Sequence, residues 1–142
     1  MSSPTILALT AFISWALALL ILMEILRTKL VIAKKTVVTS FVPDNSNLSP
    51  FMQRLARAHA NCIEGIPIFG GLMLIAIATD RTSVTNSLAL VLLAARITQS
   101  LIHLSSSSST AINLRFLAFA VQVGIAVYWC YGLLLGHWRN VA

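Results

Sequence analysis

The chain has 142 residues, of which 58% are hydrophobic and only 10% are charged, and its mean hydropathy is +0.87. Soluble domains carry about 25% charged residues, so this composition excludes an ordinary soluble enzyme and indicates an integral membrane protein. The length allows a single domain, residues 1–142. The net charge of +6 flanks apolar stretches and forms no basic patch on a soluble domain, so we exclude nucleic acid as a partner.

Four apolar segments are long enough to cross a bilayer, which takes about 20 residues. The first segment follows an uncharged start, MSSPT, and its apolar run is long, so we expect a retained helix and not a cleaved signal peptide. The prediction is an all-α fold, an integral membrane four-helix bundle with both termini on one side. The expected spans are residues 4–26, 53–79, 84–104 and 113–136.

Basic residues concentrate in the first loop and its flanks, whereas the second loop holds Arg81 beside Asp80 and the tail holds Arg139. Lys and Arg accumulate in cytoplasmic loops, so we expect the first and third loops in the cytoplasm, in contact with anionic membrane lipid. Because the chain is short, a bacterial inner membrane is preferred over the endoplasmic reticulum. The first-loop cations are Arg27, Lys29, Lys34, Lys35, Arg54 and Arg57.

The serine run and the two cysteines have simple structural interpretations. SSSSST, residues 105–110, is expected to form the third loop, where a serine or threonine can cap a helix. Cys62 and Cys130 fall about 15 Å apart in depth at ~1.5 Å per residue, which is too far for a disulfide within one chain.

Polar residues of the second span form one stripe. Arg54, Arg57, Asn61 and Glu64 follow one another at intervals of three or four residues, so they share a helix face. His59 falls on another face, which carries no second His, Cys or carboxylate, so no metal site is predicted. This stripe lies at the end of the span that joins the basic first loop.

The third and fourth spans bring polar residues to the same end. Arg96, Gln99 and His103 share a face of the third span, and the fourth begins with Asn113 and Arg115. Ionisable groups inside a membrane usually face the bundle interior or a wet cavity and pair with one another. We therefore expect one polar cluster at the first-loop end of the bundle.

Glu64 is the deepest acid of its stripe and needs a partner to remain ionised. Arg57 on the same helix and Arg96 opposite are candidate partners, and Glu24 could compete for them. A mostly basic pocket with one acid suits a small anionic molecule that carries an amine, and an open lipid-facing side would admit an apolar co-substrate. The structural alternative is that these polar contacts only tie the helices together.

The stretch RLARAHANCIEGIPIF, residues 54–69, closely resembles the signature of the MAPEG family, the membrane-associated proteins in eicosanoid and glutathione metabolism. The family pattern is Arg, two residues, Arg-Ala, two residues, Asn, two residues, Glu, then Pro and an aromatic residue. The later stretch AINLRFLAFAV resembles the start of the family's fourth helix, and the resemblance extends over nearly the whole chain. The matching residues are Arg54, Arg57, Ala58, Asn61, Glu64, Pro67 and Phe69.

The resemblance implies a homotrimer that binds glutathione between neighbouring subunits near the cytoplasmic face. Arg115 resembles the arginine that stabilises the glutathione thiolate in members such as leukotriene C synthase and prostaglandin E synthase, because a nearby cation lowers the pKa of a thiol. The thiolate would then attack a lipophilic electrophile or a peroxide, as in the microsomal glutathione transferases. The glutathione-binding set implied by position is Arg54, Arg57, Asn61, Glu64, Gln99 and His103.

Several positions depart from the eicosanoid-forming members. Ala60 replaces a further arginine, Gln99 and His103 replace His and Tyr, and Phe116 and Phe119 replace Ser and Tyr. These departures mean that the eicosanoid activities do not transfer to this chain.

Three hypotheses remain open. The first is a glutathione-dependent transferase or peroxidase for lipophilic small molecules. The second is a non-catalytic member that binds a lipid or a partner. The third is a structural or transport role, which the lack of polar residues in the outer halves of the spans disfavours.

Overall fold

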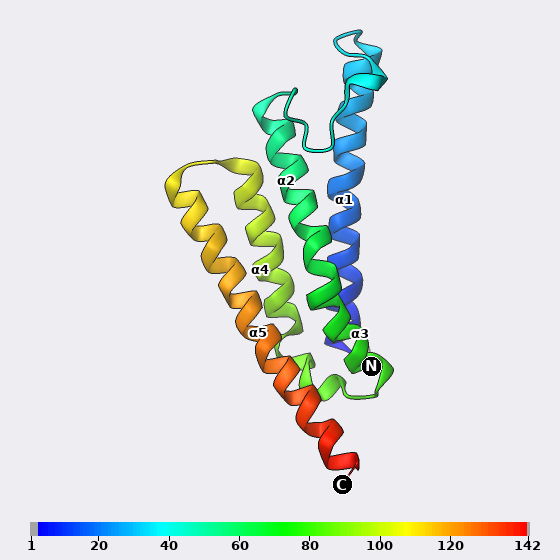
Figure 1. Cartoon of the computed structure of the whole chain (residues 1–142), viewed down its shortest axis with the longest axis vertical. Helices are drawn as coiled ribbons and strands as arrows, with labels where there is room; N and C mark the ends of the chain where they lie inside the picture. The colour runs from blue at the N-terminus through cyan, green and yellow to red at the C-terminus, as the bar shows by residue number, and fades with distance from the viewer. Residues whose placement is uncertain (1–2, 142) are drawn as a thin grey trace.

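The computed structural model describes residues 3–141, and for residues 136–141 it describes the backbone alone. Four long helices run up and down beside one another, and the described residues form no strand (Figure 1). All four are long and apolar enough to cross a membrane, so the prediction of an all-α four-helix membrane fold is confirmed. The elements are α1 (Pro4–Ile32), η1 (Val38–Ser40), α2 (Pro50–Gly65), η2 (Ile66–Gly70), α3 (Gly71–Ala78), η3 (Thr82–Val84), α4 (Asn86–Ser105) and α5 (Ser109–Val141).

The two ends of the bundle carry different loops. The loop-1 end carries the loops 33–49 and 106–108, and the terminal end carries the start of α1, the loop 79–85 and the end of α5 (Figure 1). The elements α2, η2 and α3 follow one another without a break and form a single span from residue 50 to residue 78.

The first helix is longer than predicted. It runs to Ile32, past the expected end at residue 26, and it stops where Lys34 takes a left-handed conformation with φ 53°. The backbone N–H groups of Lys34 and Lys35 then donate to the carbonyls of Val31 and Leu30, which closes the helix end.

The fourth helix starts earlier than predicted because a serine caps it. Ser108 Oγ accepts a hydrogen bond from the N–H of Ala111 at 3.2 Å, so the helix begins at Ser109 instead of residue 113. The helix before it continues to Ser105, and the serine loop shrinks to residues 106–108. The capping role predicted for this run is confirmed.

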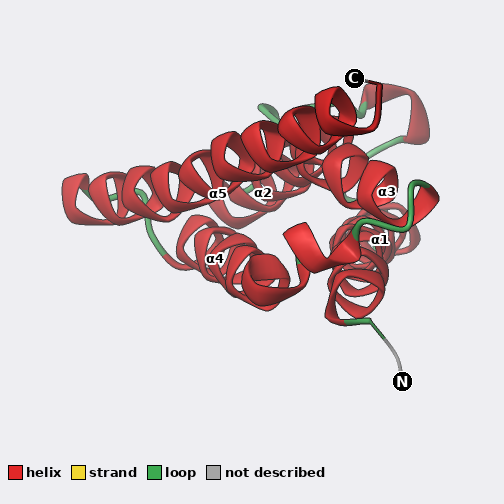
Figure 2. Cartoon of the chain, turned by 90° about the horizontal axis from the view of Figure 1, so that it is seen from below, coloured by secondary structure: helices red, strands yellow, loops and turns green. Residues whose placement is uncertain are grey.

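Helix α4 is the centre of the bundle. It packs against α1, α2 and α5, whereas α5 meets the second span mainly at η2 and α3. Figure 2 shows α5 running obliquely across the bundle while α1 is seen nearly end-on. As a result, α2 and α5 diverge toward the loop-1 end. The side chains packed in the core include Phe12, Leu55, Phe69, Leu92 and Trp129.

A π-helical turn at residues 66–70 interrupts the second span. Pro67 has no N–H and its ring crowds the preceding turn, so a regular α-helix cannot pass through it without losing a hydrogen bond. The wider turn accommodates the proline and leaves Phe69 and Gly70 buried. The helix resumes at Gly71, and Phe69 thereby reaches the centre of the bundle.

Hydroxyl and amide groups join α1 to α4 at the terminal end. Thr5 and Thr85 are fully buried, and their Oγ1 atoms lie 2.7 Å apart in a hydrogen bond. Asn86 Oδ1 accepts hydrogen bonds from the Thr5 hydroxyl at 2.8 Å and from the Ser3 hydroxyl at 2.6 Å. Each polar group here has a partner, as burial next to an apolar bilayer requires.

The first loop is fastened to the bundle by a buried asparagine. Asn45 Oδ1 accepts from Arg27 Nη2 at 2.6 Å and from its Nε at 3.1 Å, and Asn45 Nδ2 donates to the carbonyl of Met52 at 3.0 Å. Arg27 also pairs with Glu24 at 3.0 Å. Glu24 and Arg27 are therefore engaged with each other and with the loop.

We expect Asn45→Ala to lower the thermal stability of the detergent-purified protein. The change removes three hydrogen bonds and places alanine at φ 54°, with an expected cost of about 1–3 kcal/mol. Asn47→Ala is the matched control, because Asn47 is exposed and makes one bond to the Ser40 carbonyl. A thermal melt in which both variants behave alike would contradict this role of Asn45.

Candidate functional site

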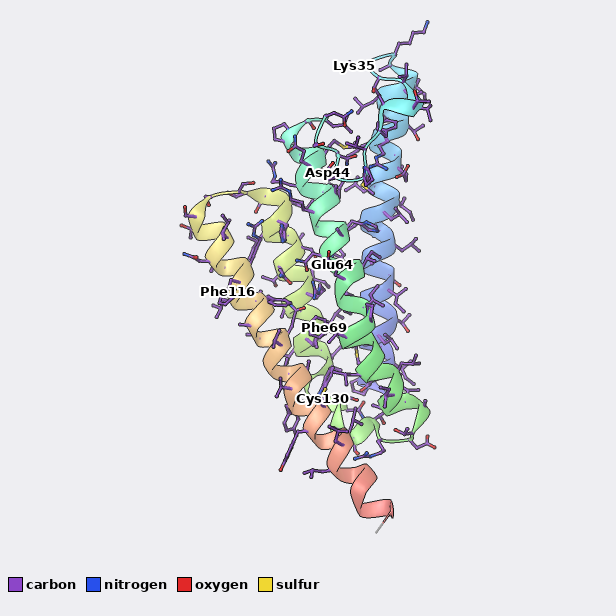
Figure 3. All side chains as sticks on the ribbon, viewed as in Figure 1. Lys35, Asp44, Glu64, Phe69, Phe116 and Cys130 are labelled. Carbon is purple, nitrogen blue, oxygen red and sulfur yellow. The ribbon has the colours of Figure 1, made fainter. Side chains whose placement is uncertain are left out.

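A cavity of about 660 Å³ lies between the second span, α4 and α5. It opens where α2 and α5 diverge, and Figure 3 shows Glu64 on α2 and Phe116 on α5 at similar heights, with Phe69 and Cys130 farther toward the terminal end. Polar side chains lie at the loop-1 end of the cavity and apolar ones line the rest. The lining residues are Asn61, Glu64, Gly65, Ile68, Phe69, Arg96, Gln99, His103, Ile112, Arg115, Phe116, Phe119, Val123, Ala126, Val127 and Cys130.

Arg96 is a buried cation in this wall. Only 1% of the residue is exposed, and its guanidinium lies between the rings of Phe12 and Phe69, at 5.3 and 5.2 Å from their centroids. Its Nη1 donates to the backbone carbonyl of Asn61 at 3.2 Å and to the Asn61 side-chain oxygen. Its Nε and Nη2 are buried without a hydrogen-bond partner among the described residues. The cavity wall therefore contains a positive charge, and two of its nitrogen donors are not used in hydrogen bonds among the described residues.

Gly65 makes room for this guanidinium. A Cβ at position 65 would lie 2.6 Å from Arg96 Nη2 and 3.2 Å from Phe69 Cδ2, both shorter than ordinary contacts. The absence of a side chain lets α4 place its arginine directly against α2. The residue spacing places Arg96 on the polar face of its span, but Arg96 is not part of the predicted binding set.

The pairing predicted for Glu64 does not form within the chain. Arg96 bonds to Asn61 instead, and Glu24–Arg27 is the one ion pair among residues whose side chains the structure describes. Glu64 is exposed on α2, on the rim of the main cavity, and it also lines a second hollow of about 450 Å³ between α1 and α2. The reason is the helix geometry, since Gly65 and Asn61 face α4 while Glu64 turns outward.

Arg115 and His103 meet across the cavity mouth. Arg115 Nη1 lies 2.7 Å from His103 Nδ1, which joins the beginning of α5 to the end of α4. Both residues are half-buried and both line the cavity. The structure thus brings the predicted thiolate-stabilising arginine beside a predicted binding residue.

Gln99 is tied to α5 by a residue that the sequence analysis missed. Gln122 Nε2 donates to Gln99 Oε1 at 3.0 Å and to the Ala118 carbonyl at 2.9 Å. Both glutamines are buried. The isolated glutamine in the middle of an apolar span was the signal that could have identified Gln122, because a buried amide needs a partner.

Arg54 and Arg57 lie outside the cavity wall. Arg54 Nε donates to the carbonyl of Leu104 at 2.9 Å and so holds the end of α4. Arg57 is exposed on the surface of α2. Of the predicted set, the cavity brings together Asn61, Glu64, Gln99, His103 and Arg115.

A smaller cavity of about 420 Å³ continues toward the terminal end and shares Cys130 with the first. Its wall is mainly apolar, and Arg81 lies in it with Nη2 donating to the Gly132 carbonyl at 2.8 Å. Arg81 therefore fastens the loop 79–85 to α5. Cys130 and Cys62 are both free thiols, as predicted from their depths, and the side chain of Arg139 lies outside the described residues.

We expect Gly65→Ala to destabilise the protein by about 1–3 kcal/mol, because the new methyl group displaces a confined guanidinium. Gly71→Ala on the same span is the matched control, since its Cβ meets nothing within 4 Å and alanine favours the helix by up to about 1 kcal/mol. Thermal unfolding in detergent measures both. A Gly65→Ala variant as stable as Gly71→Ala would show that Arg96 is not confined there.

Comparison with known proteins places this architecture in a family. The model of the MAPEG family matches residues 5–135, which includes every residue that lines the two cavities. No curated protein and no solved structure matches the chain. With nearly its whole length matched, the chain belongs to the MAPEG family.

Proposed function

We propose that this protein is a membrane-bound, glutathione-dependent transferase or peroxidase that acts on lipophilic electrophiles or peroxides. The observation that carries the proposal is that one cavity holds two arginines, Arg96 and Arg115, which have no acidic partner among the described side chains, with Glu64 on its rim. Glutathione presents carboxylates to the arginines and an amine to the glutamate. The MAPEG family includes glutathione-dependent enzymes, which supports this ligand.

Each polar residue has a proposed task. Arg96 and Asn61 hold a carboxylate, because two donors of the Arg96 guanidinium lack a partner and guanidinium–carboxylate bonds are strong. Glu64 holds the amine. Arg115 stabilises the thiolate by its charge, since a nearby cation lowers the pKa of a thiol.

The reaction follows from the thiolate. The thiol proton leaves to water at the cavity mouth, and the sulfur attacks an electrophilic carbon, forming a C–S bond while the leaving group departs with its electron pair. With a peroxide, the sulfur attacks one oxygen and an alcohol leaves. A second glutathione then reduces the resulting sulfenic acid to give a disulfide and water.

The apolar wall suits a substrate delivered by the bilayer. Beyond the polar end, the cavity is lined by residues such as Phe119, Val123 and Val127, and it continues into the smaller cavity at Cys130. From Arg115 to Cys130 the helix rises about 22 Å at ~1.5 Å per residue. The proposal therefore places the polar peptide at the loop-1 end and the lipophilic molecule along α5.

The proposed assembly is a homotrimer with the first and third loops in the cytoplasm. Arg57 and Glu64 are exposed on α2, where contact with lipid is costly for ionisable groups, and a second copy covering α2 removes that cost. The concentration of lysine and arginine in the first loop supports the cytoplasmic side.

A non-catalytic lipid-binding or partner-binding role is the second candidate. Phe116 is 72% exposed and Phe119 is 40% exposed beside Arg115, and neither can donate a hydrogen bond to sulfur. This candidate predicts that a lipophilic ligand binds without consumption of thiol.

Calorimetry with reduced glutathione and the detergent-purified protein tests the proposal. We expect millimolar or tighter binding by the wild type and about tenfold weaker binding by Glu64→Gln, because charge-assisted hydrogen bonds contribute about 1.5–3 kcal/mol. Arg115→Ala is expected to lose about 10²-fold or more in conjugation rate, the magnitude typical of a removed charge-stabilising group.

Lys35→Ala is the matched control, because it removes one positive charge from an exposed position away from the cavity. Unchanged turnover in Arg115→Ala would refute the mechanism. Ligand binding without thiol consumption would favour the non-catalytic role, and loss of folding in Glu64→Gln without a specific loss of affinity would favour a structural role.

A further inference from the structure

The contact between Arg115 and His103 constrains the chemistry of the histidine. A guanidinium carries only donors, so the Nδ1 of His103, 2.7 Å away, must accept the hydrogen bond with its lone pair. The imidazole is then neutral and its proton is on Nε2. Arg115 thus selects one tautomer of the ring.

The Nε2–H group of this tautomer is a free donor. It has no hydrogen-bond partner among the residues whose side chains the structure describes, and the ring lines the main cavity. Phe116 and Phe119 on α5 have no donor. Gln99 accepts from Gln122 through Oε1 and keeps its side-chain nitrogen as a further donor in the cavity wall.

The surroundings of His103 hold its turn of the helix in place and bring mainly positive charge to the ring. Arg54 of α2 bonds to the carbonyl of the next residue, Leu104, at 2.9 Å and fixes the last turn of α4. The charged groups that act on the ring are Arg115 of α5, Arg57 of α2 and Arg96 of α4, all cationic. Glu64 lies on the rim of the same cavity but makes no hydrogen bond to the ring among the described residues.

We propose that His103 is a second catalytic donor of the thiolate site, which offers its Nε2–H to the glutathione sulfur while Arg115 fixes the ring through Nδ1. This inference rests on the proposed function and adds a residue to it. The thiol proton still leaves to water at the cavity mouth, and no proton is transferred to the ring. Because Nδ1 and Nε2 point to different sides of the ring, the imidazole lies between the Arg115 guanidinium and the sulfur anion, and Arg115 acts on the sulfur by its charge across the ring.

Three variants of the full-length, detergent-purified protein separate the two nitrogens. His103→Phe removes both, His103→Asn keeps an acceptor near the position of Nδ1, and His103→Gln can place an amide N–H near the position of Nε2. The probe is reduced glutathione, and the measurement is the ultraviolet absorbance of its bound thiolate as a function of pH.

For His103→Phe we expect the apparent pKa of the bound thiol to rise by about one unit, a tenfold change in the thiolate equilibrium. His103→Gln should recover most of this shift and His103→Asn should not. His59→Phe is the matched control, because His59 lies on α2 outside the main cavity and lines the hollow between α1 and α2. It should leave the thiol pKa unchanged.

The inference is overturned if His103→Phe titrates like the wild type, if His103→Asn rather than His103→Gln preserves the low thiol pKa, or if all three variants lose it equally. The last two results would mean that His103 acts only through Arg115. A wild-type protein that binds no glutathione would overturn the proposed function, and this inference with it. A wild-type thiolate signal that is insensitive to position 103 would overturn only the inference.

Discussion

The position of one buried positive charge, that of Arg96, governs the arrangement of the site. Moving an ion out of water costs several kcal/mol even after relaxation, so a buried guanidinium needs compensation from its surroundings. The rings of Phe12 and Phe69 provide it at 5.3 and 5.2 Å from the guanidinium, and Asn61 accepts hydrogen bonds from one nitrogen. Cation–π contacts of this kind contribute about 0.5–2 kcal/mol each. The compensation is incomplete, since Nε and Nη2 have no hydrogen-bond partner among the described residues.

The need to accommodate the buried Arg96 side chain relates two features of the second span, the π turn and Gly65. The π turn allows the second span to pass Pro67 and present Phe69 to the guanidinium, and Gly65 leaves the space that the arginine occupies. Polar ties at the two ends of the bundle hold the helices around this centre. Thr5 and Thr85 join α1 to α4 at the terminal end, and Asn45 holds the first loop against Arg27 at the other. In the middle of α5 the Gln122–Gln99 hydrogen bond ties the helix to α4, and the cavity lies between these two helices and the second span.

Membership of the MAPEG family and the departures from its pattern concern different parts of the cavity. The matching residues Asn61 and Glu64 lie on the second span, whereas Phe116 and Phe119 lie on α5 near Arg115 and carry no hydroxyl group. The Arg115–His103 contact occupies this altered side. Asn61 and Glu64 of the family pattern thus line the cavity from the second span, whereas two hydroxyl-bearing positions of the pattern on α5 are phenylalanines here.

The sequence by itself determined the membrane fold, the four helices and the end of the bundle at which polar residues gather, because hydropathy and helical spacing are local properties that the bilayer enforces. It also identified Asn61, Glu64, Gln99, His103 and Arg115, all of which line one cavity. Only the tertiary structure decided which of these groups meet. In the structure, Arg96 bonds to Asn61, Glu64 is exposed, and Arg54 bonds to the Leu104 carbonyl. The choice of partner depends on how the packed helices rotate and cross. The spacing of residues along one helix does not specify this.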